Sequence, residues 1–237
     1  MFSSQAKPTP SPSPTPMEEE MEPPIIPSMP PMTPIPTHTP LPTKTPTITP
    51  TATPSVPITW PKDQPVYCRF GPGTGYLAIG ALELGQSAEI AGRNADGTWW
   101  YIRNPADPYN FCWVSLKVTH WAGNLTIVPI VPTPAASVTN VKVNIDPPSM
   151  TVPCASLPQV LYIRAKITTN GPASVTWRWE TSAGNSANVT TLFIESGAQT
   201  VEYQIHAGSA GDYLAKLRVI SPNGKVGRAE AHVACTP

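Results

Sequence analysis

Charged residues are scarce in this chain of 237 residues, where Asp, Glu, Lys and Arg together make up only 13%. Soluble domains usually carry about a quarter. The formal net charge is zero, from 15 basic and 15 acidic side chains, and Lys and Arg form no cluster along the sequence. Because nucleic-acid binding needs clustered cations to neutralise phosphates, this composition argues against a nucleic-acid partner.

Catalytic and metal-binding patterns are also absent from the sequence. The four histidines, His38, His120, His206 and His232, are scattered and form no H-x-x-x-H pair. The sequence has neither a G-x-S-x-G nucleophile elbow nor a phosphate-binding glycine loop. We therefore expect a chain that is not an enzyme and that holds neither a metal nor a cofactor.

Long apolar runs are missing as well. No window reaches 18 apolar residues, so the sequence predicts no membrane span. Residues 1–16 lack the apolar segment of a signal peptide. The cysteines and the stalk described below nevertheless favour export. We therefore expect an extracytoplasmic protein whose export signal or anchor lies upstream of this sequence.

Proline, in contrast, is abundant: the chain has 33, and more than half precede Pro61. In residues 1–57 proline often alternates with Ser or Thr, and large apolar residues are few and scattered. Because proline fixes φ and lacks an amide donor, neither a helix nor a sheet ladder can form there. The composition predicts a disordered, extended stalk over 1–57. Folded domains follow at 58–126 and 138–237, joined by a second Pro-rich linker at 127–137.

The chain has four cysteines, Cys68, Cys112, Cys154 and Cys235, and no two form a C-x-x-C motif. Four cysteines allow three pairings. One pair falls within each predicted domain, so the simplest solution joins Cys68 to Cys112 and Cys154 to Cys235. Disulfides form in oxidising compartments, which again favours an extracytoplasmic protein.

Short apolar and aromatic runs separated by turn residues fill the range 58–126. Turn signals occur at Gly71-Pro72-Gly73, Leu84-Gly85 and Asp96-Gly97. Strands of this length with such turns are typical of a small barrel or sandwich. Asp96-Gly97, just before an aromatic strand, is a strong hairpin signal.

These residues resemble the bacterial SH3 domain family (SH3b). The stretch from Cys68 to Tyr76 is similar to that family's R-x-G-P-x-T-x-Y loop, and Asp96 to Ile102 is similar to its D-G-x-W-x-x-V strand. Leu82–Gln86 is similar to its L-x-x-G turn. Cys112-Trp113-Val114 is similar to its closing G-W-V strand, with Cys112 in place of the usual Gly. The resemblance implies a five- or six-stranded barrel of the kind that often binds cell-wall peptidoglycan or other envelope glycans and peptides.

Aromatic side chains are too dense in this domain for a small barrel to bury them all. In the strand 99–102 the side chains alternate between faces. If Trp100 and Ile102 point inward, Trp99 and Tyr101 point outward, and the nearby glycines allow close backbone approach to a ligand. We therefore predict a ligand site formed by Gly73, Tyr76, Trp99 and Tyr101. In the alternative, the aromatic side chains only pack against loops, the second domain or each other.

The range 138–237 contains seven candidate strands separated by turns, at 141–145, 160–167, 175–179, 188–193, 200–205, 213–219 and 228–233. This number and spacing predict an Ig-like β-sandwich. We expect Trp177 or Trp179 to fill its core and Tyr213 to form a tyrosine corner. A Cys154–Cys235 bridge would tie the two ends of this domain together and would not cross its core, which departs from the Ig pattern.

Together these features predict an all-β, non-catalytic, extracytoplasmic binding protein that carries an SH3b-like barrel and an Ig-like sandwich on a stalk. The first functional hypothesis is that the barrel binds cell-wall peptidoglycan or another envelope glycan or peptide. The second is a structural or adhesive stalk whose β-domains contact other surface proteins. An exposed aromatic patch on the barrel would favour the first, and a free edge strand on the sandwich would favour the second. In both cases we expect a monomer.

Overall fold

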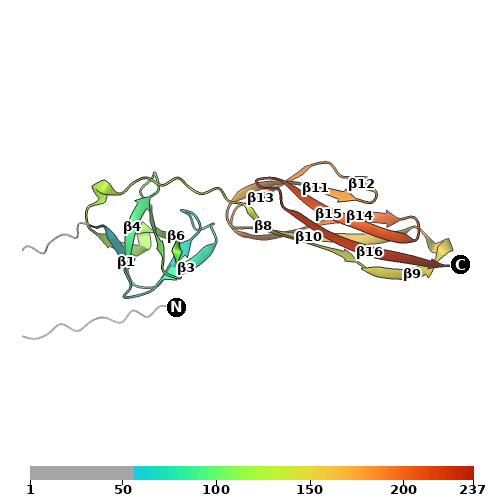
Figure 1. Ribbon diagram of the computed structural model, residues 1–237, viewed down its shortest axis with the longest axis horizontal. Coiled ribbons are helices and arrows are strands. Elements are labelled where there is room, and N and C mark those ends of the chain that lie inside the picture. Colours follow the sequence, from blue (N-terminus) through green and yellow to red (C-terminus); the bar gives the residue numbers. More distant parts are fainter. Residues whose placement is uncertain (1–55) are drawn as a thin grey trace, which may run out of the picture. The chain divides into compact units, whose positions relative to one another are not determined.

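The computed structural model describes residues 56–237, which belong to one compact unit (Figure 1). The predicted stalk at 1–57 lies almost entirely outside the described residues. The described residues form β-strands and three short 3-10 helices, which confirms the predicted all-β fold. Folded structure begins slightly earlier than predicted, because Pro57 is buried and its carbonyl accepts the amide of Ile90 at 2.8 Å. No helix among these residues is long and apolar enough to span a membrane.

Seven strands form the first sheet, in the order β3-β2-β6-β5-β4-β1-β7 (Figure 1). Val66 and Leu82, near one end of this order, share a single core with Ile102 of the middle strand β5 and with Ile90 of β4, toward the other end. The sheet therefore curls over itself as a small barrel. The strands are β1 Ile58–Pro61, β2 Val66–Arg69, β3 Ala78–Leu82, β4 Ala88–Arg93, β5 Trp99–Asn104, β6 Asp107–Ser115 and β7 Thr119–Ala122.

The hairpin between β4 and β5 forms where the Asp-Gly signal predicts it. Gly97 has a φ of 65°, in the left-handed region that glycine adopts without strain. Its amide donates to the carbonyl of Asn94 at 3.1 Å. The side-chain oxygen of Asn94 in turn accepts the amides of Thr98 and Trp99, at 2.8 and 2.9 Å. The buried Asn94 thus fixes the start of β5 and, with it, the orientation of the aromatic strand.

The predicted linker, 127–137, is not a free connector in the structure. Val128 is 6% exposed and lies in the barrel core. The amide of Arg93 donates to the carbonyl of Pro129 at 2.9 Å, and the amide of Val131 donates to the carbonyl of Arg93 at 2.8 Å. These bonds form because β1 pairs only with the start of β4 and leaves the edge at Arg93 open. The linker docks on the barrel through apolar residues such as Val128, which lie between its prolines. Its proline content alone did not indicate this packing.

The second set of strands forms a sandwich of two sheets, which Figure 1 shows in yellow to red. One sheet has the order β14-β10-β8, and the other has the order β12-β11-β15-β16-β9, with β13 paired to β11. Trp177 and Trp179 both lie in the core between them, 5% and 2% exposed. The strands are β8 Val138–Asp146, β9 Ser149–Pro153, β10 Gln159–Thr169, β11 Ala173–Thr181, β12 Gly184–Asn185, β13 Val189–Phe193, β14 Gly197–Ala207, β15 Gly211–Ser221 and β16 Val226–Thr236. All seven predicted strands are present, with β9 and β12 in addition.

Two disulfides join the cysteine pairs expected from the sequence, Cys68–Cys112 and Cys154–Cys235. Cys68 and Cys112 are fully buried in the barrel core, with Cα atoms 5.3 Å apart. The other bridge is partly exposed and ties the residue after β9 to β16, the strand with which β9 pairs in parallel. It does not cross the sandwich core, as expected. Both bridges indicate an oxidising compartment.

The tyrosine corner predicted at Tyr213 is present at the start of β15. The Tyr213 hydroxyl donates to the carbonyl of Ser209 at 2.7 Å and accepts the Ser209 amide at 3.1 Å. Two hydrogen bonds therefore hold the turn from β14 into β15.

We expect Tyr213→Phe to lower the free energy of unfolding of the sandwich by about 1 kcal/mol, since the change removes one hydroxyl and leaves the ring in place. Urea unfolding of the full chain measures this loss. Tyr162→Phe is a matched control. Tyr162 is 49% exposed on β10, and its hydroxyl forms no hydrogen bond within residues 56–237. An equal loss in the two variants would contradict a stabilising corner.

Candidate functional site

Strand β5 has the facing that alternation predicts. Trp100 and Ile102 are 2% and 0% exposed and lie in the barrel core. Trp99 and Tyr101 lie on the opposite face and are partly exposed. The predicted orientation of this strand is therefore correct.

The outer face of β5 continues over its neighbours through the pairing register. Tyr101 lies opposite Trp113 of β6, and Trp113 lies opposite Arg69 of β2. Residues that face each other across strands share one side of a sheet. The same side therefore carries Tyr67, two residues before Arg69, and Trp99, two residues before Tyr101. This face of the barrel is aromatic along three adjacent strands.

A hollow of about 530 Å³ lies on this face between β2, β3, β5 and the turn after β6. We call it the Tyr67–Trp99 groove, after its two aromatic walls. Tyr67 is 64% exposed, the highest exposure of any aromatic side chain in the groove, and Trp99 is partly exposed. The charged and polar side chains of the lining are Gln64, Arg69, Thr74, Glu83, Ser115 and Lys117.

One charged group of the groove, Arg69, is held by contacts within the barrel. The guanidinium of Arg69 lies 5.3 Å from the centre of the Tyr67 ring and donates to the carbonyl of Tyr76 at 2.7 Å. Arg69 therefore orients the Tyr67 ring and connects the groove to the glycine-rich loop. Lys117 and Glu83, which directly follows β3, also line the groove, and both are exposed. The groove thus offers two aromatic faces, two cations and one carboxylate.

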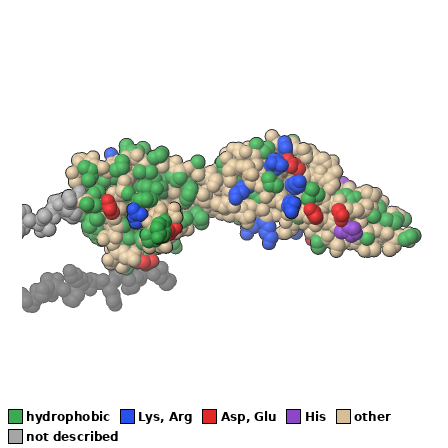
Figure 2. Space-filling model, viewed as in Figure 1, with side chains coloured by type: hydrophobic (Ala, Val, Ile, Leu, Met, Phe, Trp, Pro, Cys, Tyr) green, Lys and Arg blue, Asp and Glu red, His purple; other side chains and the backbone are tan. Residues whose placement is uncertain are grey.

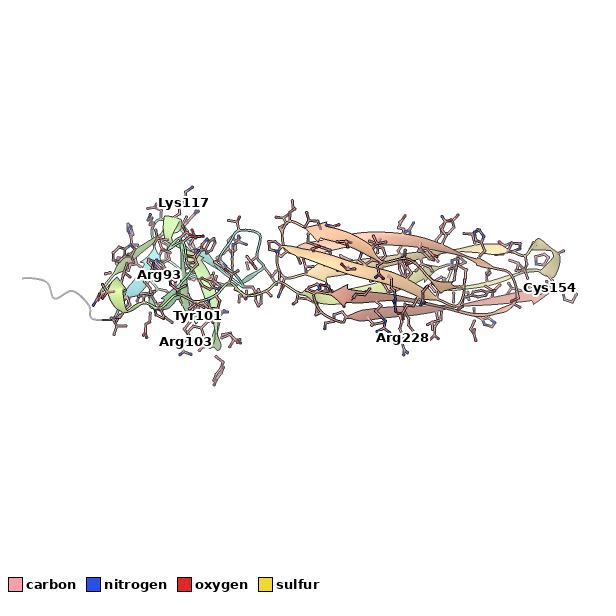
Figure 3. The ribbon with its side chains drawn as sticks, turned by 90° about the horizontal axis from the view of Figure 1, so that it is seen from above. Arg93, Tyr101, Arg103, Lys117, Cys154 and Arg228 are labelled. Atoms are coloured by element: carbon pink, nitrogen blue, oxygen red, sulfur yellow. A yellow bond between two sulfur atoms is a disulfide. The ribbon has the colours of Figure 1, made fainter. Side chains whose placement is uncertain are left out.

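Tyr101 lies in a different hollow from Trp99. Its ring stacks on Phe111 with centroids 4.9 Å apart and an interplanar angle of 15°, and it also contacts Trp113 at 4.9 Å. This hollow, of about 280 Å³, is lined in part by linker residues, including Val131 and Pro132. In Figure 3, Lys117 lies at one edge of the barrel, and Tyr101 lies toward the other. The structure therefore separates two side chains that the sequence analysis placed in one site.

Tyr76 lines neither hollow, because its ring is used in packing. A Cβ placed on Gly71 would lie 2.5 Å from the Tyr76 ring, and one on Gly171 would lie 2.6 Å from it. A Cβ on Gly73 would lie 3.3 Å from the same ring. These glycines therefore make room for Tyr76, and the close approach that we assigned to a ligand is made by this side chain.

The loop around Tyr76 also bonds to the sandwich. The amide of Leu77 donates to the carbonyl of Asn170 at 3.0 Å, and the amide of Ser196 donates to the carbonyl of Gly75 at 2.6 Å. Packing against the second domain was the alternative considered for the aromatic residues, and Tyr76 follows it.

Of the four predicted site residues, Trp99 alone lines the larger groove. From the glycine-rich loop, Thr74 lines this groove, whereas Gly73 and Tyr76 do not. The sequence analysis missed Tyr67, Arg69 and Lys117. Alternation could have identified Tyr67, because it stands between Val66 and Cys68, which both face the core. Nothing local in the sequence indicates that Lys117 reaches the same groove, since it belongs to a 3-10 turn after β6.

Among the described residues no group of three or more His, Cys, Asp or Glu side chains lies close enough together to hold a metal ion. The groove lining itself contains one carboxylate and neither His nor Cys. Its groups are suited to stacking, charge pairing and hydrogen bonding with a bound molecule.

Comparison with known proteins gives no family for this chain: no family model and no curated protein matches it. Several solved structures show weak similarity, and they include the following three. The CARDB domain of the PF1109 protein from Pyrococcus furiosus, solved with di-metal ions, has a TM-score of 0.33 and 13% identity and covers 41% of this chain and 94% of its own. The β-glucosidase EmGH1 from Erythrobacter marinus has a TM-score of 0.31 and 8% identity over 42% of this chain and 15% of its own. Bacteroides uniformis β-glucuronidase 3 has a TM-score of 0.26 and 12% identity over 76% of this chain and 25% of its own. None of these similarities assigns a function to this chain.

Proposed function

We propose that this chain is a non-catalytic extracytoplasmic binding protein whose SH3b-like barrel holds cell-wall peptidoglycan or another envelope glycan or peptide in the Tyr67–Trp99 groove. The observation that carries the proposal is the pairing of an exposed Tyr67 with Trp99 in one hollow of about 530 Å³. Aromatic rings offer large contact faces at small entropic cost, and sugar rings and peptide planes stack on them.

The chemistry of the rim fits such a ligand. Peptidoglycan peptides carry carboxylates, which can pair with Arg69 and Lys117, and amide N–H groups, which can donate to Glu83. Figure 2 shows that hydrophobic side chains, with few charged ones, cover much of the barrel surface in that view. A sparsely charged surface leaves stacking and hydrogen bonding as the main contributions to binding.

The test is sedimentation of the full chain with purified cell wall. We expect Trp99→Ala to weaken binding about thirtyfold, because loss of an anchoring aromatic side chain costs ~2 kcal/mol. Tyr67→Ala should weaken binding by a similar factor. Both variants should keep the parent melting temperature to within a few degrees, since neither side chain belongs to the core.

Trp121→Ala is the matched control, because Trp121 is 45% exposed on β7 and does not line the groove. It should bind as the parent does. Unchanged binding by both the Trp99 and the Tyr67 variants would mean that the groove is not the site. Failure of the parent chain to sediment with the wall would refute wall binding itself.

A second candidate function, adhesion through protein contacts, is favoured by strand β14. This strand has 11 residues and, within residues 56–237, pairs only with β10, so no described strand covers its other edge. A long free edge can accept a strand from another protein. A proline placed in β14 at a residue whose amide faces outward would abolish such pairing and would leave wall binding unchanged.

A further inference from the structure

The outer face of β11, β15 and β16 gathers cations that are far apart in the sequence. Trp177, Trp179, Leu217 and Val219 point into the core, so the residues between them point outward. In Figure 2, Lys and Arg side chains gather over the middle of the sandwich, with Asp and Glu among them. We call this surface the basic face and define it by Arg178, Lys216, Arg218 and Arg228.

The register places these cations directly opposite one another. Arg178 lies opposite Arg218, and Lys216 lies opposite Arg228. Side chains directly opposite on neighbouring strands are about 5 Å apart at Cβ, and like charges in that position are destabilising. Two adjacent rungs of the sheet therefore carry like-charged pairs.

One of these pairs is neutralised within the chain. Glu180 accepts hydrogen bonds from Arg178 at 2.8 Å and from Arg218 at 2.7 Å. The hydrogen bond from Arg218, and then that from Arg178, hold the pKa of the Glu180 carboxyl below its usual value. Glu180 therefore stays charged and compensates the first pair in part.

Glu180 also lies directly opposite Lys216 in the register, but its carboxylate is bonded to Arg178 and Arg218. Within the described part of the chain, neither Lys216 nor Arg228 forms an ion pair. Glu230, two residues after Arg228, points outward from the next rung, where it lies opposite Leu214. The basic face thus carries four cations against two carboxylates, and Figure 3 shows Arg228 projecting from the sandwich.

The spacing of the cations suits an extended chain of anions. Neighbouring strands are about 4.8 Å apart, and residues two apart on one strand are separated by about 6.7 Å. A polymer with one anionic group per repeat can contact Arg218, Lys216 and Arg228 in succession.

We propose that the basic face binds an anionic glycan, whose repeating carboxylate or phosphodiester groups pair with Lys216, Arg218 and Arg228. The two disulfides indicate an oxidising compartment, apart from the cytosol and nucleus, so we take a glycan and not a nucleic acid as the polyanion. This surface is separate from the Tyr67–Trp99 groove, and the proposal does not depend on the function of that groove.

The test measures anisotropy of two labelled polymers with the full chain, between 50 and 200 mM NaCl. One probe is alginate, a polyuronate, and the other is poly(glycerol phosphate). We expect the chain to bind at least one of them, with affinity that falls as salt rises, and the preferred probe identifies the anionic group. The double variant K216Q/R228Q should weaken binding about tenfold or more and lower the slope of log affinity against log salt by about two.

The matched control is K142Q/K166Q. Lys142 and Lys166 also lie directly opposite each other, on the other sheet, so both variants remove two charges from a like-charged pair. The control should keep most of the parent affinity. E180Q should bind more tightly than the parent, because it leaves Arg178 and Arg218 uncompensated.

Several results would overturn the proposal. These are failure to bind either glycan at 50 mM NaCl, an equal loss in the two double variants, and tighter binding of duplex DNA than of both glycans. The single variants K216Q and R228Q repeat the measurement if the double variant unfolds.

Discussion

Replacing Trp100 with alanine should destabilise the barrel by about 3–5 kcal/mol, the usual cost of removing a large aromatic side chain from a core. Trp100 is 2% exposed and belongs to the barrel core with Ile90 and Ile102. A small domain has a total stability of only about 5–15 kcal/mol. The variant should therefore be unfolded, or close to unfolding, at 37 °C, and calorimetry of the full chain measures the loss.

Two variants separate packing from other effects of this change. The indole nitrogen of Trp100 is buried and has no hydrogen-bond partner among the described residues. Trp100→Phe keeps much of the packing and removes this unsatisfied donor, so it should cost clearly less than Trp100→Ala. Trp121→Ala removes a neighbouring ring 6.3 Å away that is 45% exposed, and it should cost less than about 1 kcal/mol. Equal losses for Trp100 and Trp121 would show that the core assignment is wrong.

Removing the barrel disulfide should have an effect of similar size. Cys68 and Cys112 are 44 residues apart, and a loop of this length is stabilised by about 4 kcal/mol in the chain-entropy account of disulfides. The double variant Cys68→Ala/Cys112→Ala should lose this stabilisation together with the packing of two fully buried sulfur atoms. Hydrogen exchange should show the loss of protection in β2 and β6.

The sandwich bridge is the comparison. Cys154 and Cys235 are 81 residues apart, and the longer loop adds only about 0.5 kcal/mol in the same account. Cys154 is exposed and Cys235 partly exposed, so little packing is lost with them. We therefore expect removal of the Cys68–Cys112 bridge to lower the free energy of unfolding more than removal of the Cys154–Cys235 bridge, in spite of its shorter loop. A larger loss for Cys154→Ala/Cys235→Ala would mean that loop entropy outweighs burial here.

The basic face illustrates what a linear reading of charge misses. No cluster of Lys and Arg is present along the sequence, and the nucleic-acid class was set aside on that ground. Arg178, Lys216 and Arg228 come together because β11, β15 and β16 are neighbours in one sheet. Alternation alone predicts that each points outward, whereas the register decides which of them lie opposite one another.

The sequence by itself determined the local features of this protein. Strand positions followed from apolar runs between turn residues, and the facing of Trp99 and Trp100 followed from the period of two. Asp96-Gly97 determined its hairpin because glycine adopts the required φ without strain. The disulfide pairs followed from one pair falling in each folded range. These features depend on residues near one another in the chain, or on a choice among few alternatives.

Only the tertiary structure decided which of these features meet. Trp99 and Tyr101 share a face, but the docked linker and Phe111 enclose Tyr101, while Trp99 faces Tyr67 across the groove. Gly71 and Gly171, 100 positions apart in the sequence, both make room for the Tyr76 ring. Contacts of this kind depend on strand order and on which elements pack together, and no local pattern encodes them because each partner alone is compatible with many arrangements.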